Sequence, residues 1–222
     1  MTVAEPAPAS GELRPEPQFA SLRQQAEVTT LGMWAFLATE ILFFGGLLLA
    51  YAVLRKAYPL GFAAAGRETK IVIGTTNTII LLTSSATMAW AVHAAQAGRR
   101  RLASLLLALT AAFGLAFIGL KGVEYFQEYR EQLVPGINFS FAGEHAHAAE
   151  LFFFLYFIAT GVHALHLTIG IAVVAIMSVR ARRGAFSSEY YTPVEVTGLY
   201  WHFVDLVWIF LYPLIYLNGR AG

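Results

Sequence analysis

Residues 151–179 read LFFFLYFIATGVHALHLTIGIAVVAIMSV, an apolar run that contains two histidines and no Asp, Glu, Lys or Arg. At 1.5 Å per residue, a helix of this length can cross the ~30 Å hydrocarbon core of a bilayer. In lipid, only helices and closed barrels satisfy all of their backbone hydrogen bonds internally. The stretch therefore predicts a transmembrane helix in an integral membrane protein.

Four more runs of the same kind occupy residues 31–54, 71–97, 102–120 and 196–217. The composition agrees, because 57% of the residues are hydrophobic and 13% are charged, against roughly 25% charged residues in soluble domains. We expect an all-α fold, a polytopic bundle of five transmembrane helices that forms a single domain over residues 29–219. Residues 1–28, rich in proline and charge, are expected to form a flexible N-terminal tail.

The distribution of basic residues predicts the orientation of the bundle. Eight basic residues fall on the side of the N-terminus and seven on the other, so the count alone does not decide it. The density of basic residues decides the orientation, because two arginine groups, 99–101 and 180–183, lie in short connections on the N-terminal side. The opposite side also collects six glutamates: Glu68, Glu124, Glu128, Glu131, Glu144 and Glu150. The positive-inside rule then places the N-terminus inside.

Several classes of site are excluded or disfavoured by the sequence. The chain has no cysteine, which excludes disulfides, thiolate zinc sites, iron–sulfur clusters and cysteine-ligated copper within it. Its net charge is +1 with scattered basic residues, so no cationic face for nucleic acid is expected. Glu144, His145 and His147 fall in a predicted outer loop, with a spacing far looser than metal-ligand signatures. We expect no metal site.

Four ionisable side chains fall inside the predicted spans: Glu40, His163, His166 and Asp205. Glu40 and Asp205 each lie about nine residues, or ~14 Å, into spans that enter from the same side. The two histidines lie near the middle of a span that enters from the other side. Because an ionisable group at mid-bilayer costs about 2.5 to 3.5 kcal/mol on insertion scales, we expect these residues to form a polar layer across three helices.

Two interpretations of this layer are open. It could be a proton relay or ion-binding site of the kind found in transporters and pumps. It could instead be a buried polar cluster that fixes helix register, built from His163, His166, His202 and Asp205 with neutral or paired side chains. The spacing favours the cluster. Haem ligation is disfavoured, because His163 and His166 share one helix face and His93 and His202 lie nearer the inner surface.

Several blocks of the sequence resemble the third core subunit of the haem-copper cytochrome c oxidases. In chain order they are GMWAFLATEILFF at 32–44, NTIILLTSSATMAW at 77–90, GVEY at 122–125, ATGVHALH at 159–166 and YWHFVDLVW at 200–208. Their common order and spacing cover most of residues 31–217. Seven-span members of that family carry two additional N-terminal helices, and this chain begins at the equivalent of the third. It is thus similar to the short bacterial five-helix form.

The resemblance implies a non-redox core subunit III of a bacterial aerobic respiratory cytochrome c oxidase, in the inner (plasma) membrane. The chain would hold no catalytic residue, cofactor or metal, and the haems and copper would belong to partner subunits. Subunit I would reduce oxygen to water and pump protons. The implied partners are subunits I and II, subunit IV in some assemblies, membrane lipids and a larger respiratory supercomplex, but no nucleic acid.

The resemblance also implies roles for two residues. Glu40 takes the position of the family's membrane-buried glutamate, on the wall of a lipid-filled cleft that faces subunit I. There it would tune the interface or the local proton supply. Arg180 falls on the position of an arginine that binds a phospholipid headgroup, and its place at a helix end suits snorkelling to phosphate. Phospholipid in the cleft would stabilise the complex and guide oxygen inward.

Three other functions remain open from the sequence. One is a subunit III homologue of a nitric oxide reductase system. Another is a small ion-coupled secondary transporter that uses Glu40, Asp205 and His163 as its ion site, which would predict inverted repeats and broken helices. The last is a b-type cytochrome, for which the histidines are poorly placed.

Overall fold

The computed structural model describes residues 17–217 and 220. Within these residues the chain forms six helices and no strand: α1 (Leu22–Ala57), α2 (Pro59–Glu68), α3 (Ile71–Gln96), α4 (Arg100–Arg130), α5 (Ala146–Arg182) and α6 (Thr192–Tyr216). All except α2 are long and apolar enough to cross a membrane. The prediction of an all-α fold with five membrane-spanning helices is confirmed.

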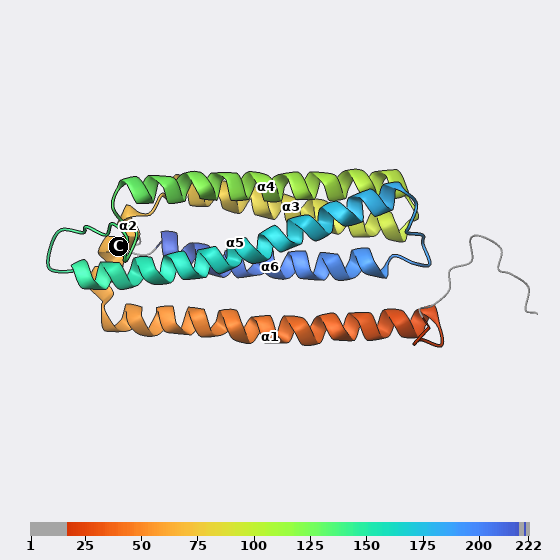
Figure 1. Cartoon of the computed structure of the whole chain (residues 1–222), viewed down its shortest axis with the longest axis horizontal. Coiled ribbons are helices and arrows are strands. Elements are labelled where there is room, and N and C mark those ends of the chain that lie inside the picture. The colour runs from red at the N-terminus through yellow and green to blue at the C-terminus, as the bar shows by residue number, and fades with distance from the viewer. Residues whose placement is uncertain (1–16, 218–219, 221–222) are drawn as a thin grey trace, which may run out of the picture.

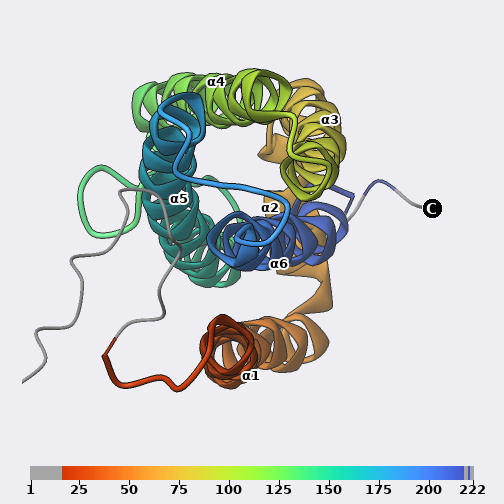
Figure 2. The same cartoon turned by 90° about the vertical axis from the view of Figure 1, so that its right-hand side faces the viewer.

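Four of the long helices form a closed group, and α1 lies outside it. Seen along the helix axes, α3, α4, α5 and α6 surround a common core, while α1 lies beside α6 and α5 (Figure 2). From the side, the five long helices run lengthwise, and α5 crosses the others at an angle (Figure 1). The outer face of α1 remains open, since Leu42 is 77% exposed and Leu49 is 65% exposed.

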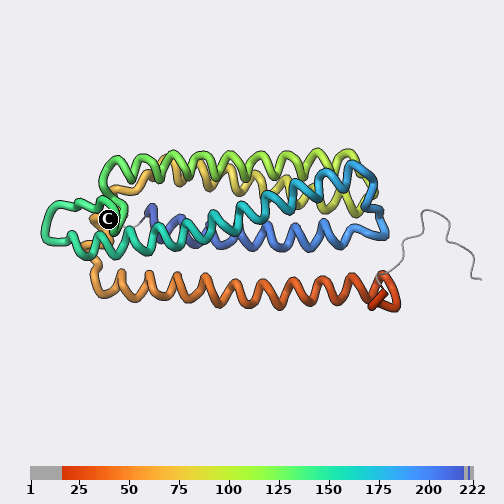
Figure 3. The backbone as a smooth tube through the Cα atoms, in the orientation of Figure 1, coloured from red at the N-terminus to blue at the C-terminus, as the bar shows by residue number. Residues whose placement is uncertain are grey.

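The backbone trace separates two ends of the bundle (Figure 3). The start of α1 and the α3–α4 and α5–α6 connections lie at one end, which we call the N-terminal end. Helix α2 and the α4–α5 loop lie at the opposite end, together with the end of α6. At that opposite end, Lys70 Nζ lies 2.6 Å from Glu131 Oε1, and an Arg220 guanidinium nitrogen donates to the carbonyl oxygens of Arg67 and Thr69 at 2.6 Å.

Helix α1 begins earlier than predicted. The Ser21 hydroxyl accepts a hydrogen bond from the Gln24 N–H at 3.2 Å, a side-chain cap that satisfies one of the free donors at a helix start. Residues 22–28, which the sequence analysis assigned to the tail 1–28, are therefore the first turns of this helix. Residues 1–16 of that predicted tail lie outside the described residues.

Helix α2 was not predicted, and it closes the bundle at its far end. Pro59 occupies the first helical position, where its missing N–H costs nothing. The Phe62 ring is fully buried and meets the Phe152 ring edge-on, with centroids 5.6 Å apart. A Cβ on Gly61 would lie 2.3 Å from the Ala148 side chain, so glycine allows α2 to pack directly on α5.

Helix α4 continues ten residues beyond the predicted end of its span at Leu120. Lys121, one of the seven basic residues assigned to the outer side, was expected at the outer surface together with Glu124 and Glu128, and that expectation is wrong. Their exposed fractions are 2%, 0% and 0%. The spacing of three and four residues puts all three on one helix face, and that face points into the bundle.

The core is built around the tryptophans of α6. Trp201 and Trp208 are almost completely buried, and the Phe117 ring of α4 meets Trp208 edge-on at 4.8 Å. A Cβ on Gly114 would lie 2.7 Å from Ile171 and 2.9 Å from Trp201. Glycine at this position lets α4 approach α5 and α6 closely, as small residues do in membrane helix packing.

We expect Gly114→Ala to lower the free energy of unfolding by about 1 to 3 kcal/mol, because the added methyl overpacks a fixed contact. Gly119→Ala is the matched control on the same helix, since a Cβ there meets nothing within 4 Å. Thermal unfolding in detergent, followed by tryptophan fluorescence, would measure both. Equal melting temperatures for the two variants would show that the Gly114 contact is not tight.

Candidate functional site

Glu40 and His166 form a pair between α1 and α5. His166 Nε2 lies 3.1 Å from Glu40 Oε2, and the two side chains are 15% and 17% exposed. The Phe44 ring meets the imidazole edge-on at 5.2 Å. The Tyr200 hydroxyl of α6 donates to the His166 carbonyl oxygen at 2.9 Å. The pair therefore lies in the seam where α1 joins α5 and α6.

The contacts of the His166 ring determine how many protons the pair holds. Its Nδ1 lies 2.9 Å from the Val162 carbonyl oxygen, which can only accept, so Nδ1 carries a hydrogen. The contact between Nε2 and Glu40 Oε2 then needs one more proton, on either the imidazole or the carboxyl group. The pair is thus a neutral carboxylic acid with neutral histidine, or a carboxylate with imidazolium. In both forms it holds one shared proton within the membrane-spanning region.

The other predicted members of the polar layer lie apart from this pair. His163 is fully buried between the rings of Phe117 and Trp208, with centroids 5.6 and 5.1 Å away. Neither of its ring nitrogens has a hydrogen-bond partner in the described part of the chain. His163 therefore points into the four-helix group, whereas His166, three residues later, points toward α1.

His202 and Asp205 lie on α6, near α3. His202 Nδ1 is 2.8 Å from the Ser85 hydroxyl. Asp205 is 4% exposed, and neither of its carboxyl oxygens has a hydrogen-bond partner among residues 17–217 and 220. The structure thus brings Glu40 and His166 together, places His163 among aromatic rings of the four-helix group, and leaves His202 and Asp205 beside α3.

Arg180 lies near the end of α5, at the N-terminal end of the bundle. Its side chain is exposed, and its guanidinium lies over the Phe186 ring at 5.6 Å from the centroid. His145 immediately precedes α5, and the ring of His147 packs edge-on against Tyr58. Within the described residues, no group of three His, Cys, Asp or Glu is arranged to hold a metal ion.

A buried charged cluster centred on Lys121 was not predicted from the sequence. Its ammonium group donates to Glu124 Oε2 at 3.0 Å and to the hydroxyls of Tyr156 and Tyr216 at 2.8 and 2.7 Å. Both tyrosine hydroxyls also donate to Glu124 Oε1, at 3.1 and 2.7 Å. All three ammonium donors and both carboxylate oxygens are therefore satisfied, by side chains from α4, α5 and α6.

Aromatic rings complete the surroundings of the Lys121 ammonium. The rings of Tyr125 and Trp208 have centroids 5.1 and 5.6 Å from Nζ, within the range of cation–π attraction, whereas Tyr156 and Tyr216 meet the ammonium through their hydroxyls. Glu128, one turn beyond Glu124, is fully buried and lacks a hydrogen-bond partner in the described chain. The helical spacing of residues 121, 124 and 128 was the sequence signal that could have identified this cluster.

Comparisons with known proteins, by family model and by individual relatives, indicate the same family. The family model described as cytochrome c oxidase subunit III matches residues 21–220. Among curated relatives, cytochrome c oxidase subunit 3 of Cyprinus carpio and that of Oncorhynchus mykiss are each 34% identical to this chain over 194 residues. Those alignments cover 85% of this chain and 69% of each relative. The protein of the same name from Gadus morhua matches with the same identity and coverage.

We expect Lys121→Met to destabilise the bundle by about 3 to 5 kcal/mol, because it leaves the buried Glu124 carboxylate without its cation. The double variant Lys121→Met with Glu124→Gln removes both charges and should recover most of that loss. Thermal unfolding in detergent of the wild type, both single variants and the double variant would give the coupling energy. If the stability lost in the double variant equals the sum of the two single losses, Lys121 and Glu124 do not act as one electrostatic unit.

Proposed function

The chain belongs to the cytochrome c oxidase subunit III family, and from that membership we propose that it is the non-redox core subunit III of a bacterial aerobic respiratory oxidase. In this proposal the chain holds no haem, copper or other redox cofactor, which reside in subunits I and II. It supports subunit I, where oxygen is reduced to water and protons are pumped. Subunit IV and a larger supercomplex are further proposed partners.

The Glu40–His166 pair carries the proposal. Its geometry connects α1 to the rest of the bundle at 3.1 Å, and one face of α1 remains open to lipid or to another subunit. We assign to Glu40 two consequences of this position. It fixes α1 against the four-helix group, and it keeps one exchangeable proton inside the membrane, next to the surface that would meet subunit I.

The transporter alternative finds no support in the helices. That reading predicts discontinuous spans whose ends bind the ion. The five candidate spans are continuous in the described chain, including α6, where Pro213 lies in the last turn. Glu40, Asp205 and His163 also do not meet at a common site.

The proposed orientation places the N-terminal end inside, in a bacterial plasma membrane. Seven arginines of the described chain lie at that end: Arg23, Arg99, Arg100, Arg101, Arg180, Arg182 and Arg183. At the opposite end Lys70 is paired with Glu131, and Arg220 binds backbone carbonyl oxygens. Lys121 no longer counts toward that surface because it is buried. Six basic residues remain at that end, Arg55, Lys56, Arg67, Lys70, Arg130 and Arg220, so the proposed orientation rests on the density of arginines in the short connections of the N-terminal end.

Removing this subunit from the purified oxidase should leave the haem spectrum and the initial rate of oxygen uptake unchanged. Activity should then decay after fewer turnovers, because subunit I loses the support that this chain provides. Oxygen uptake followed through many turnovers, together with the visible spectrum, would measure both. Loss of a haem band would contradict the assignment of a non-redox role.

Glu40→Ala should shorten the active lifetime of the oxidase, measured as turnovers before half-inactivation, with little change in the initial rate. Glu40→Gln keeps a hydrogen-bonding group and should have the smaller effect. Thr39→Ala is the matched control, because Thr39 is an exposed neighbour on α1 that bonds only within its own helix, to the Phe36 carbonyl. Unchanged turnover, proton uptake and inactivation rate in Glu40→Ala would refute this role.

A further inference from the structure

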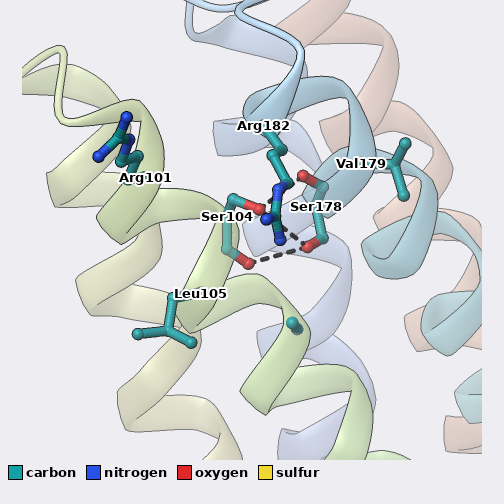
Figure 4. A pocket seen from close by; sticks show the side chains of 7 residues that line it. Arg101, Ser104, Leu105, Ser178, Val179 and Arg182 are labelled. Atoms are coloured by element: carbon teal, nitrogen blue, oxygen red, sulfur yellow. Dashed lines mark hydrogen bonds between the residues drawn. The ribbon is translucent and has the colours of Figure 1, made fainter.

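A cavity of about 660 Å³ opens between α4 and α5 at the N-terminal end of the bundle. Arg101 and Leu105 line it from α4, and Val179 and Arg182 line it from α5, around a pair of serines (Figure 4). This volume is within the range of small-molecule binding sites. The cavity is separate from the Glu40–His166 pair, which lies in the seam of α1.

The bottom of the cavity is a fixed contact between the two helices. The Ser104 hydroxyl donates to the Ser178 carbonyl oxygen at 2.9 Å, and the Ser178 hydroxyl donates to the Ser104 carbonyl oxygen at 2.8 Å. Both serines are 8% exposed. Reciprocal bonds of this kind hold membrane helices close together, so the cavity is set by the packing of α4 on α5.

Two unpartnered cations line this cavity. Arg101 and Arg182 are exposed, and neither has a hydrogen bond or ion pair to any residue in the described chain. In Figure 4 the Arg182 side chain extends from α5 across the serine pair. The lining that the structure describes contains no acidic side chain. A planar guanidinium fork favours phosphate and carboxylate oxygens, so the ligand is expected to be an anion.

The walls beside the serine pair add a second requirement. Leu105 lies one turn inward from Arg101 and is 65% exposed, and Val179 lies inward from Arg182 and is 50% exposed. Cations at the helix ends are thus followed by open apolar surface toward the middle of the bundle. A phospholipid has the same order of charge and hydrocarbon, whereas a free phosphate ion would use the arginines alone.

We propose that the α4–α5 cavity binds an anionic phospholipid, with its phosphate on Arg101 and Arg182 and an acyl chain along Leu105 and Val179. Basic pockets between membrane helices on the cytoplasmic side bind such headgroups. This site differs from the one suggested for Arg180, which lies two residues from Arg182 and so on a different face of α5, over Phe186. It also goes beyond the proposed oxidase role, since it depends only on this chain's own groove.

The test compares phosphatidylglycerol binding to the purified, delipidated oxidase complex in matched variants. Arg101→Gln combined with Arg182→Gln should raise the apparent dissociation constant for phosphatidylglycerol by about tenfold or more, measured by native mass spectrometry of the delipidated complex. Arg23→Gln combined with Arg183→Gln removes the same charge from the same end without touching the cavity lining, and should bind as the wild type does. Equal losses in both double variants would show only general electrostatic attraction and would overturn the site.

Further arms separate the alternatives. Phosphatidylcholine should bind much more weakly than phosphatidylglycerol, and inorganic phosphate should not displace the lipid. Displacement by inorganic phosphate would mean that a free anion is the ligand, which overturns the proposal. If the Arg101→Gln and Arg182→Gln variant lost a partner subunit while its lipid binding stayed unchanged, the proposal would also be overturned. If the Gln variant fails to assemble, Arg101→Lys with Arg182→Lys keeps the charge but loses the fork, and intermediate affinity is then expected.

Discussion

The ammonium group of Lys121 is the charge on which the arrangement of α4, α5 and α6 depends. It is inside the bundle with all three of its hydrogens donated, to Glu124 and to tyrosines from the other two helices. A charge in that position without partners would cost several kcal/mol. The three helices must therefore meet in one register. In that register Trp201, Trp208 and Phe117 form the core of the bundle.

Helix α1 is attached in a different way. Its inward face meets α5 and α6 through the Glu40–His166 pair and through the Tyr51 hydroxyl, which donates to the Leu214 carbonyl oxygen. Most of its outer surface is open. The fold thus combines a four-helix group fixed by buried charge and aromatic packing with one helix held at its margin. The outer face of that helix is not covered by any described part of the chain, and the α4–α5 cavity lies on a separate seam of the bundle.

Much of the fold could be read from the sequence, because bilayer thickness sets a minimum length for apolar runs. The five spans follow from that pattern, whereas the family was indicated by separate blocks of residues that resemble it. The same criterion failed at Lys121, where a charge was taken as the end of a span, although its partners at positions 124, 156 and 216 lie on three helices. Depth in the membrane did place Glu40 and His166 at matching levels. It could not show that His163 turns away from them, since rotation of a helix depends on packing.

The Glu40–His166 pair also has a consequence for how the protein is made. The two residues are 126 positions apart, and synthesis at roughly 5 to 20 residues per second separates them by about 6 to 25 s. During that interval α1 has entered the membrane with its glutamate unpaired. A carboxyl group in that state is costly in hydrocarbon, so α1 cannot make its final contacts until α5 arrives. The final packing of α1 against α5 must therefore follow the insertion of α5, although α1 precedes α5 in the chain.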